Sequence, residues 1–461
     1  MELDALVRPN GPTMQTPNDG PVADSIGLYS LVPYAEDYGE RADARRCFSA
    51  VESTCQVTWT DVGDQVTVKA LNSLADIRRY RTLPRVQGGI RILSINQRNS
   101  WRPLNVTRDM FNEVVDVAGA SSDLLELPLS FFQKRLPLEE GFTSAPVFRF
   151  NPDSLEIIYT IKYAFEKAPQ EKGKDPWVLR QTGVYQKYEF TTKHSTWLFL
   201  SPTAECEFQS RLMRHLQSPT NRASLEQNPL LIHSILFGTF FHAWREYLKH
   251  LEGRMLPIAI ATVAAEIDKP LRVNHESLVA VRETENRCLI LQPIFRSLDK
   301  TLEVLHQANS KISEVGGIGQ DELQGMKQLL NNYSAAADSY GQAACSLQSR
   351  TSRIATHINE TLSFQDAYIA KRQTEFMLRD STTVRVITVV TLVYLPATFT
   401  ATLLGMNSFF EMDENRRIIV APQFWIYVVC AVPLTAATLA YWWYFQRSKQ
   451  RTERSTEALM V

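Results

Sequence analysis

The stretch YLPATFTATLLGMNSFF, residues 394–410, belongs to a run from 386 to 410 that contains no charged side chain. A second charge-free run extends from 418 to 446. A helix needs roughly 20 apolar residues to cross a bilayer, and each run is longer than that. The two runs therefore predict two membrane-spanning helices in the C-terminal part of this sequence.

The second run has aromatic side chains at both ends, with Trp425 and Tyr427 at one end and Tyr441–Phe445 at the other. Trp and Tyr are enriched at the two membrane–water interfaces, where their polar groups reach water. We therefore predict transmembrane helices at 386–407 and 420–445. The alternative is a buried helical hairpin within a large soluble domain.

Basic residues flank the predicted transmembrane domain, residues 386–446, on the side of both termini. In the connecting loop, acidic residues outnumber arginines. The positive-inside rule then places both termini in the cytosol and the loop outside, so 447–461 is predicted to be a cytosolic tail. We expect the plasma membrane, because no organelle address is visible. The flanking residues are Lys371, Arg372, Arg379 and Arg385 before the first span and Arg447, Lys449, Arg451 and Arg454 after the second; the loop acids are Glu411, Asp413 and Glu414.

The charge and motif content of the 461 residues argues against several classes of protein. The 49 basic and 50 acidic side chains nearly cancel, so no global field would attract nucleic acid, and we expect no nucleic-acid partner. The cysteines form no C-x-x-C pair and the histidines form no H-E-x-x-H motif. Because a P-loop and a G-x-S-x-G motif are also missing, we expect no enzyme, no catalytic residue and no bound cofactor.

The residues before the predicted spans divide into three regions. Residues 1–40 are rich in Pro, Gly and Asn and are predicted to form a disordered arm. Residues 41–205 alternate β-rich and helical runs, which predicts a cytosolic α/β or α+β domain of undetermined topology. Residues 206–385 are predicted to be a cytosolic helical and stalk region. The predicted strands are 89–96, 155–165, 184–190 and 195–200, and the predicted helices are 107–119, 207–218, 229–267 and 276–314, with 229–244 as a core helix.

A single long helix is predicted from Asp321 to Leu404, because no proline precedes Pro396 and only two glycines occur in it. At about 1.5 Å per residue, this helix would be roughly 125 Å long and would connect the cytosolic body to the membrane. Apolar and small residues recur along it at spacings of four and three. This seam suits packing among several helices, and an ordinary helix inside one domain is the alternative. The seam consists of Met326, Leu330, Tyr333, Ala337, Tyr340, Ala344, Leu347, Thr351, Ile354 and Ile358.

The helical period of 3.6 residues places five side chains on one stripe of the first predicted span, with Thr388 and Thr400 off it. Polar residues within a span usually face protein or water, so the stripe is predicted to line a pore. The alternative for each threonine is a hydrogen bond to its own i−4 carbonyl. Pro396 is predicted to kink the helix, and Gly405 lets the chain leave helical geometry, which turns Asn407 toward an axis. The stripe consists of Ile387, Thr391, Leu395, Thr398 and Thr402.

Asn407 is the residue predicted to contact a metal ion, through the water shell of that ion. One carboxamide oxygen binds a cation weakly, but a ring of them from several subunits can act together. Mg²⁺ dehydrates reluctantly, and neutral carbonyl oxygens can accept hydrogen bonds from its waters. Behind this ring, the acidic loop of Glu411, Asp413 and Glu414 would attract cations.

The motifs around the first span resemble those of the CorA magnesium-transporter superfamily. Leu-Pro-x-Thr-Phe at 395–399 is followed by GMN at 405–407, and MDE at 412–414 is similar to the family's Met-Pro-Glu loop with the proline replaced. RILSINQRNSW at 91–101 resembles CorA-like proteins of filamentous fungi. The resemblance implies an α+β membrane protein: a homopentameric funnel with cytosolic α/β domains, a long stalk helix and two C-terminal transmembrane helices.

Carried over by position, the resemblance assigns roles to residues of the first span. Gly405, Met406 and Asn407 would form the outer selectivity ring. Thr398 and Thr402 would face the conduction path. Ile387 and Leu395 would form hydrophobic constrictions.

The resemblance also implies cytosolic carboxylates that bind Mg²⁺ between subunits and close the pore. Asp366, Glu375 and Asp380 precede the first span, but none matches the family's positions clearly. The leading hypothesis is a homopentameric Mg²⁺ channel surrounded by membrane lipid. The alternatives are a ZntB-like transporter of Zn²⁺, Co²⁺ or Ni²⁺, and a non-conducting, membrane-anchored regulatory or scaffold protein of the same fold.

Overall fold

The computed structural model describes residues 30–31, 35–82, 88–168, 175–204, 206–266, 269, 271–404, 410–412, 418–420, 422 and 424–457. The chain divides into two compact units. The first comprises Met1–Ala265 and Leu271–Asn359, and the second comprises Glu266–Pro270 and Glu360–Val461.

A seven-stranded mixed sheet forms the centre of the first unit, in the order β2-β1-β3-β7-β6-β5-β4. β3 and β7 pair in parallel, with Ile90 opposite Ser195, and the other neighbours are antiparallel. Three of the predicted strands are found close to their expected ends, but β6 begins well before residue 184. The strands are β1 Val57–Val62, β2 Val66–Leu71, β3 Ile90–Asn96, β4 Val147–Phe150, β5 Ser154–Glu166, β6 Trp177–Glu189 and β7 Ser195–Ser201.

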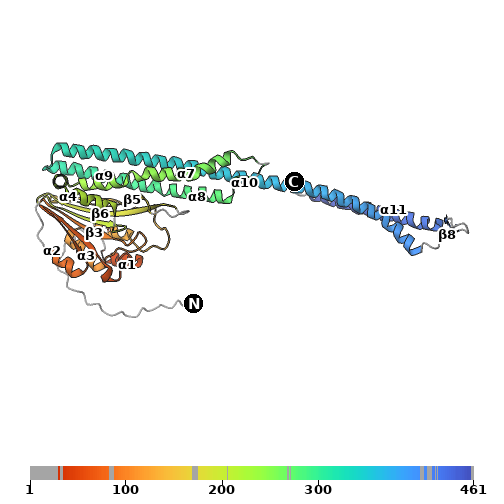
Figure 1. The fold of residues 1–461 in the computed structure, drawn as a ribbon, viewed down its shortest axis with the longest axis horizontal. Coiled ribbons are helices and arrows are strands. Elements are labelled where there is room, and N and C mark those ends of the chain that lie inside the picture. Colours follow the sequence, from red (N-terminus) through yellow and green to blue (C-terminus); the bar gives the residue numbers. More distant parts are fainter. Residues whose placement is uncertain are drawn as a thin grey trace, which may run out of the picture. The chain divides into compact units, whose positions relative to one another are not determined.

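Short helices cover one face of this sheet: α1 Ala35–Arg45, α2 Leu74–Arg81 and α3 Arg108–Ala118, with the 3₁₀ segments η2 Glu52–Thr54 and η3 Ser122–Ser130 (Figure 1). The predicted helix at 107–119 is α3. The Thr107 hydroxyl caps its start by accepting a hydrogen bond from the Met110 N–H at 3.2 Å, and Gly119 ends it in a left-handed conformation. Phe111 and Val114 of α3 are fully buried in the core on this face.

The predicted arm, residues 1–40, overlaps α1, so its last six residues are helical rather than disordered. Tyr38 on this helix is buried. Just before it, the Ser30 hydroxyl and the Leu31 N–H donate to one carboxylate oxygen of Asp123, at 2.6 and 2.7 Å. Asp123 is buried, and these bonds fix the chain at residues 30–31 to η3.

Further helices, several of them much longer, cover the other face (Figure 1). The predicted helix 229–267 is interrupted at residues 241–242, and 276–314 is interrupted at Ile290. Pro293 lies in the first turn after Ile290 and cannot donate the hydrogen bond that would continue the preceding helix. Pro219 begins a helix that the sequence analysis missed. The helices are α4 Glu207–Gln217, α5 Pro219–Gln227, α6 Leu231–Phe240, α7 Ala243–Val263, α8 His275–Leu289, α9 Leu291–Val315 and α10 Gln320–Leu404.

Helix α6 lies in the core, as predicted for 229–244, with Leu236 and Phe237 fully buried. It packs against the seam on α10, where the Tyr333 ring lies 5.5 Å from that of Phe237. Farther along the seam, Tyr340 lies 6.3 Å from Phe295 of α9. The seam therefore packs against helices of its own chain, as an ordinary helix inside one domain does.

The second unit contains the later part of α10, a short antiparallel pair of strands and helix α11. The strands are β8 Phe410–Met412 and β9 Ile418–Val420, and α11 extends over Phe424–Glu457. The second predicted span therefore begins four residues later than expected. Pro422 explains the delay, because proline disfavours helical geometry in the residue before it and lacks an N–H.

Two stretches of these helices are long and apolar enough to cross a membrane: Val384–Thr402 and Phe424–Tyr444. Their large apolar side chains are mostly exposed, for example Phe399 at 58% and Val432 at 61%. A hairpin in the core of a soluble domain would be buried instead. The exposure therefore argues against the soluble-hairpin alternative.

Candidate functional site

The five residues of the predicted pore-lining stripe are all helical on α10, and all five are exposed. Ile387 is 61% exposed and Leu395 is 62% exposed. In contrast, Thr400, which was predicted to lie off the stripe, is only 6% exposed. Thr388, the other residue predicted to lie off the stripe, is exposed, so exposure on this segment of α10 extends beyond the stripe.

Helix α11 covers part of the face that does not carry the stripe. The Tyr427 hydroxyl donates to the backbone carbonyl of Ala397 at 3.3 Å. Nearer the other end of the pair, the Arg385 guanidinium lies 5.7 Å from the centre of the Trp442 ring. The two helices are therefore antiparallel neighbours. The stripe residues stay exposed, but Leu395, Thr398 and Thr402 line a groove whose other side is formed by Leu434 and Thr438 of α11.

The stripe threonines all form hydrogen bonds within their own helix. The Thr391 hydroxyl donates to the Ile387 carbonyl at 2.8 Å, and the Thr402 hydroxyl donates to the Thr398 carbonyl at 2.8 Å. Thr398 donates to the Tyr394 carbonyl at 3.0 Å. Each hydroxyl has thus used its proton, so its oxygen remains available only as an acceptor.

Pro396 does not end the helix, because α10 continues through it to Leu404. The Thr400 hydroxyl donates to the Pro396 carbonyl at 2.8 Å, within the next turn. The predicted selectivity residues Gly405, Met406 and Asn407 lie outside the described residues.

The predicted acidic loop is described only in part. Glu411 lies in β8, but its side chain is outside the description. Asp413 and Glu414 are outside it entirely.

Carboxylates that could regulate a pore do not cluster in the described part of the chain. Asp366 and Glu375 are exposed on α10, and the side chain of Asp380 lies outside the description. Across the described ranges, no group of three or more His, Cys, Asp or Glu residues could hold a metal ion.

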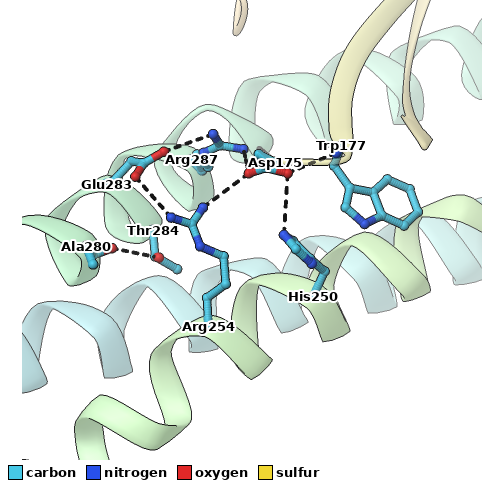
Figure 2. Close-up of polar contacts among 8 residues, drawn as sticks. All are labelled: Asp175, Trp177, His250, Arg254, Ala280, Glu283, Thr284 and Arg287. Atoms are coloured by element: carbon cyan, nitrogen blue, oxygen red, sulfur yellow. Dashed lines mark hydrogen bonds and ion pairs between the residues drawn. The ribbon is translucent and has the colours of Figure 1, made fainter. Parts of the chain in front are cut away.

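The first unit contains a charged cluster that the sequence analysis missed (Figure 2). Asp175, just before β6, lies 3.1 Å from Arg254 of α7 and 2.5 Å from Arg287 of α8. His250 of α7 also faces it, with Nε2 at 3.4 Å. Glu283 of α8 pairs with both arginines.

The opposite charges in this cluster favour the ionised forms of Arg287 and Glu283. Burial alone would lower the pKa of Arg287, but the charges of Asp175 and Glu283 outweigh it and raise that pKa. Burial would likewise raise the pKa of Glu283, but hydrogen bonds from Arg254 and Arg287 outweigh it and lower that pKa. The cluster ties α7 and α8 to the start of β6, which is a structural role.

A second polar group is buried between the sheet and α6. His233 Nδ1 lies 2.7 Å from the Tyr159 hydroxyl, and its Nε2 lies 2.8 Å from the Gln186 side-chain oxygen. The neutral ring can accept from the tyrosine and donate to the glutamine. Burial lowers the pKa of His233 to about 3, so it stays uncharged in the folded protein.

The sheet-containing part of the first unit carries a recognisable family pattern. Residues 35–262 match the family model of CorA-like transporters. The match covers just under half of the chain.

Among the solved structures that match this chain is the crystal structure of the ZntB cytoplasmic domain from Vibrio parahaemolyticus RIMD 2210633. The identity is 9%, the match covers 65% of this chain and 97% of that chain, and the TM-score is 0.35. A comparison with curated protein sequences gives no match.

Proposed function

We propose that this chain is a channel that carries divalent cations across a membrane, with Mg²⁺ as the leading cargo. The observation that carries the proposal is the exposed stripe on α10, which combines three threonines with two aliphatic side chains and lies beside the face on which α11 packs. The family match to CorA-like transporters supports the same class of function. Several copies with this stripe turned inward would enclose a path through the membrane.

Five copies around one axis would gather the stripe residues into rings. Rings of Ile387 and Leu395 would form narrow apolar constrictions that control the passage of water and ions. Rings of Thr398 and Thr402 would present hydroxyl oxygens. Because their protons are donated to backbone carbonyls, these oxygens accept hydrogen bonds from the water shell of a cation.

At the outer end, we assign selectivity to a ring of Asn407, supported by Gly405 and Met406. Its carboxamide oxygens would bind the hydrated ion without removing its waters. We assign Glu411, Asp413 and Glu414 the role of concentrating cations near the mouth. In this arrangement both termini are cytosolic, and the plasma membrane is the expected location.

Purified full-length protein in liposomes loaded with a Mg²⁺-sensitive dye tests the role of the stripe. Thr398→Val and Thr402→Val each remove a stripe hydroxyl, whereas Thr400→Val removes a buried hydroxyl from another face of the same helix. We expect each stripe variant to slow Mg²⁺ entry about tenfold, which corresponds to about 1.4 kcal/mol in the barrier. The Thr400→Val control should stay within about twofold of wild type. Equal entry in all three variants would contradict the assignment.

The same liposomes also test which cation the protein carries and whether it conducts ions at all. Faster entry of Zn²⁺, Co²⁺ or Ni²⁺ than of Mg²⁺ would favour a ZntB-like transporter. No entry of any divalent cation would favour a non-conducting scaffold. In cells, Asn407→Ala should abolish Mg²⁺-dependent growth rescue of a transport-deficient host while the protein remains in the membrane, and unchanged rescue would count against the selectivity ring.

A further inference from the structure

Two neighbouring loops of the first unit form an exposed patch that is both apolar and basic. The turn after β3 lies beside the segment after η3, because the Lys134 N–H donates to the Trp101 carbonyl at 3.0 Å. Trp101 and Pro137 also line the same small cavity. We call the exposed large apolar and arginine side chains of these two loops the loop patch. It consists of Trp101, Leu136, Leu138, Arg98, Arg102 and Arg135.

The apolar part of the loop patch is larger than a single exposed side chain. Trp101 is 45% exposed, Leu136 is 63% exposed and Leu138 is 54% exposed. Single apolar side chains are common on protein surfaces, whereas a contiguous group of them marks an interaction site. The loop patch is therefore a candidate binding surface.

The loop patch also has a surplus of positive charge. No ion pair within 4.0 Å joins its arginines to a carboxylate in the described ranges. Glu139 follows the patch in the sequence, and Arg45 forms an ion pair with it at 2.6 Å. Glu140 lines the small cavity together with Lys134 and Lys162. Positive charge beside apolar side chains suits a partner that combines acidic and apolar residues.

The first 29 residues of the sequence have this composition. They contain four acidic side chains and one arginine. Their first six residues, MELDAL, alternate Glu2 and Asp4 with Leu3 and Leu6. Acidic side chains could pair with the arginines of the loop patch while the leucines pack on its apolar members.

This part of the chain is attached close to the loop patch. The Ser30 hydroxyl and the Leu31 N–H donate to Asp123, which lies in the first turn of η3. The nine residues of η3 extend about 18 Å, and Arg135 follows its last residue by five positions, at most about 18 Å farther on. Residues 1–29 can span at most roughly 100 Å, so their first residues can reach the loop patch.

We propose that the acidic segment at residues 1–6 docks on the loop patch of its own chain. A segment of the same chain is present at an effective concentration in the millimolar range. A contact with a Kd of about 1 mM would therefore keep the segment bound about half of the time. An acidic segment of another protein would need a similar concentration to compete.

Photo-cross-linking of the full-length protein in detergent tests this contact. The chain carries the photoreactive residue p-benzoylphenylalanine in place of Leu6, and mass spectrometry after proteolysis locates each cross-link. We expect most cross-links on residues 98–102 and 134–142. In about 1 M salt the yield on these residues should fall, because exposed charges are screened.

Charge reversal shows whether the arginines hold the segment. Arg102→Glu combined with Arg135→Glu should lower the yield on the loop patch about threefold or more, as expected for the loss of exposed ion pairs. The matched control combines Arg79→Glu on α2 with Arg296→Glu on α9, because both arginines are exposed and lie outside the patch. The control should stay within about twofold of wild type.

Reversal of the acidic segment provides the complementary test. Glu2→Arg with Asp4→Arg should also lower the yield about threefold when the loop patch is unchanged. Combined with Arg102→Glu and Arg135→Glu, it should restore the yield to within about twofold of wild type, because opposite charges again face each other.

Three outcomes would overturn the proposal. Cross-links spread evenly over the first unit would mean that residues 1–6 have no preferred site. Equal yields in the loop-patch variant and the control would mean that the arginines do not hold the segment. A cross-linked product with twice the mass of the chain would show that the segment binds a second copy instead of its own chain.

Discussion

Replacing Asp175 by Asn tests whether the charged cluster in Figure 2 holds the helices to the sheet. Asn keeps the size of the side chain and can still accept the hydrogen bond from the Trp177 N–H at 2.9 Å. It removes the negative charge that faces Arg254 at 3.1 Å and Arg287 at 2.5 Å. The Asp175 side chain is 18% exposed, so water screens these ion pairs only in part.

The size of the effect follows from this partial burial. Exposed ion pairs contribute about 0.2–1 kcal/mol, whereas breaking a fully buried pair costs about 3–5 kcal/mol. Asp175 lies between these limits, and Glu283 still faces Arg254 at 3.0 Å and Arg287 at 2.9 Å. We expect Asp175→Asn to lower the free energy of unfolding by about 1–2 kcal/mol. That corresponds to a fall in Tm of about 2–6 °C.

Thermal unfolding of the full-length protein in detergent, followed by tryptophan fluorescence, measures this change. The control is Glu246→Gln, which breaks an exposed ion pair with Lys249 at 3.3 Å; both residues lie on α7, as Arg254 does. This control should shift Tm by less than about 1 °C. In about 1 M salt the effect of Asp175→Asn should shrink, because the remaining charges are screened. If Asp175→Asn and Glu246→Gln melt at the same temperature, the cluster is not a stabilising contact and the reasoning is refuted.

Three further predictions concern the backbone and the core, and melting temperature measures each. Gly183→Ala should lower the free energy of unfolding by about 1–3 kcal/mol, because the added Cβ would lie 3.0 Å from Leu127 Cγ. Gly325→Ala should raise it by about 0.5–1 kcal/mol, because the added Cβ meets open space on α10 and alanine favours helix. In the unfolded chain His233 is protonated below about pH 6.5, whereas the folded protein keeps its pKa at about 3. At pH 5.5 this difference should lower the free energy of unfolding by about 1.4 kcal/mol. His233→Gln should therefore lose less stability between pH 7 and 5.5. A wild-type Tm for Gly183→Ala, a lower Tm for Gly325→Ala, or an unchanged pH dependence for His233→Gln would contradict the respective prediction.

The long helix α10 could be predicted from the sequence because every local signal agrees along it. It was expected from Asp321 to Leu404 and is found from Gln320 to Leu404. Periodicity also identified the buried seam, but not what covers it. Tyr333 and Tyr340 meet α6 and α9, and that pairing depends on how the helices pack.

The start of strand β6 could not be predicted from the local sequence pattern. β7 pairs with β6 only over 183–188, so residues 177–182 have a β-strand neighbour on one side alone, β5. Polar side chains such as Arg180 and Gln181 are therefore tolerated there, and the alternation typical of a strand is lost.

The charged cluster could not be predicted, because Asp175 and Arg254 are 79 residues apart. Only the Glu283–Arg287 pair, four residues apart on α8, is visible in the sequence. For the predicted stripe, the spacing defined the residues that share a face. It did not say where α11 would lie, and the burial of Thr400 against the exposure of Thr402 comes from the structure.

The packing of the seam affects the order in which parts of the protein fold during synthesis. Ala337, Ala344 and Thr351 are buried against helices of their own chain, and the last residue of the first unit is Asn359. All residues that the first unit needs to fold therefore precede residue 360. Synthesis begins at the N-terminus, and domains generally fold as they emerge from the ribosome. The sheet and its helical layer can therefore be complete before the apolar runs are translated. Those runs would then emerge from an already folded body, with little chance of being trapped in its core.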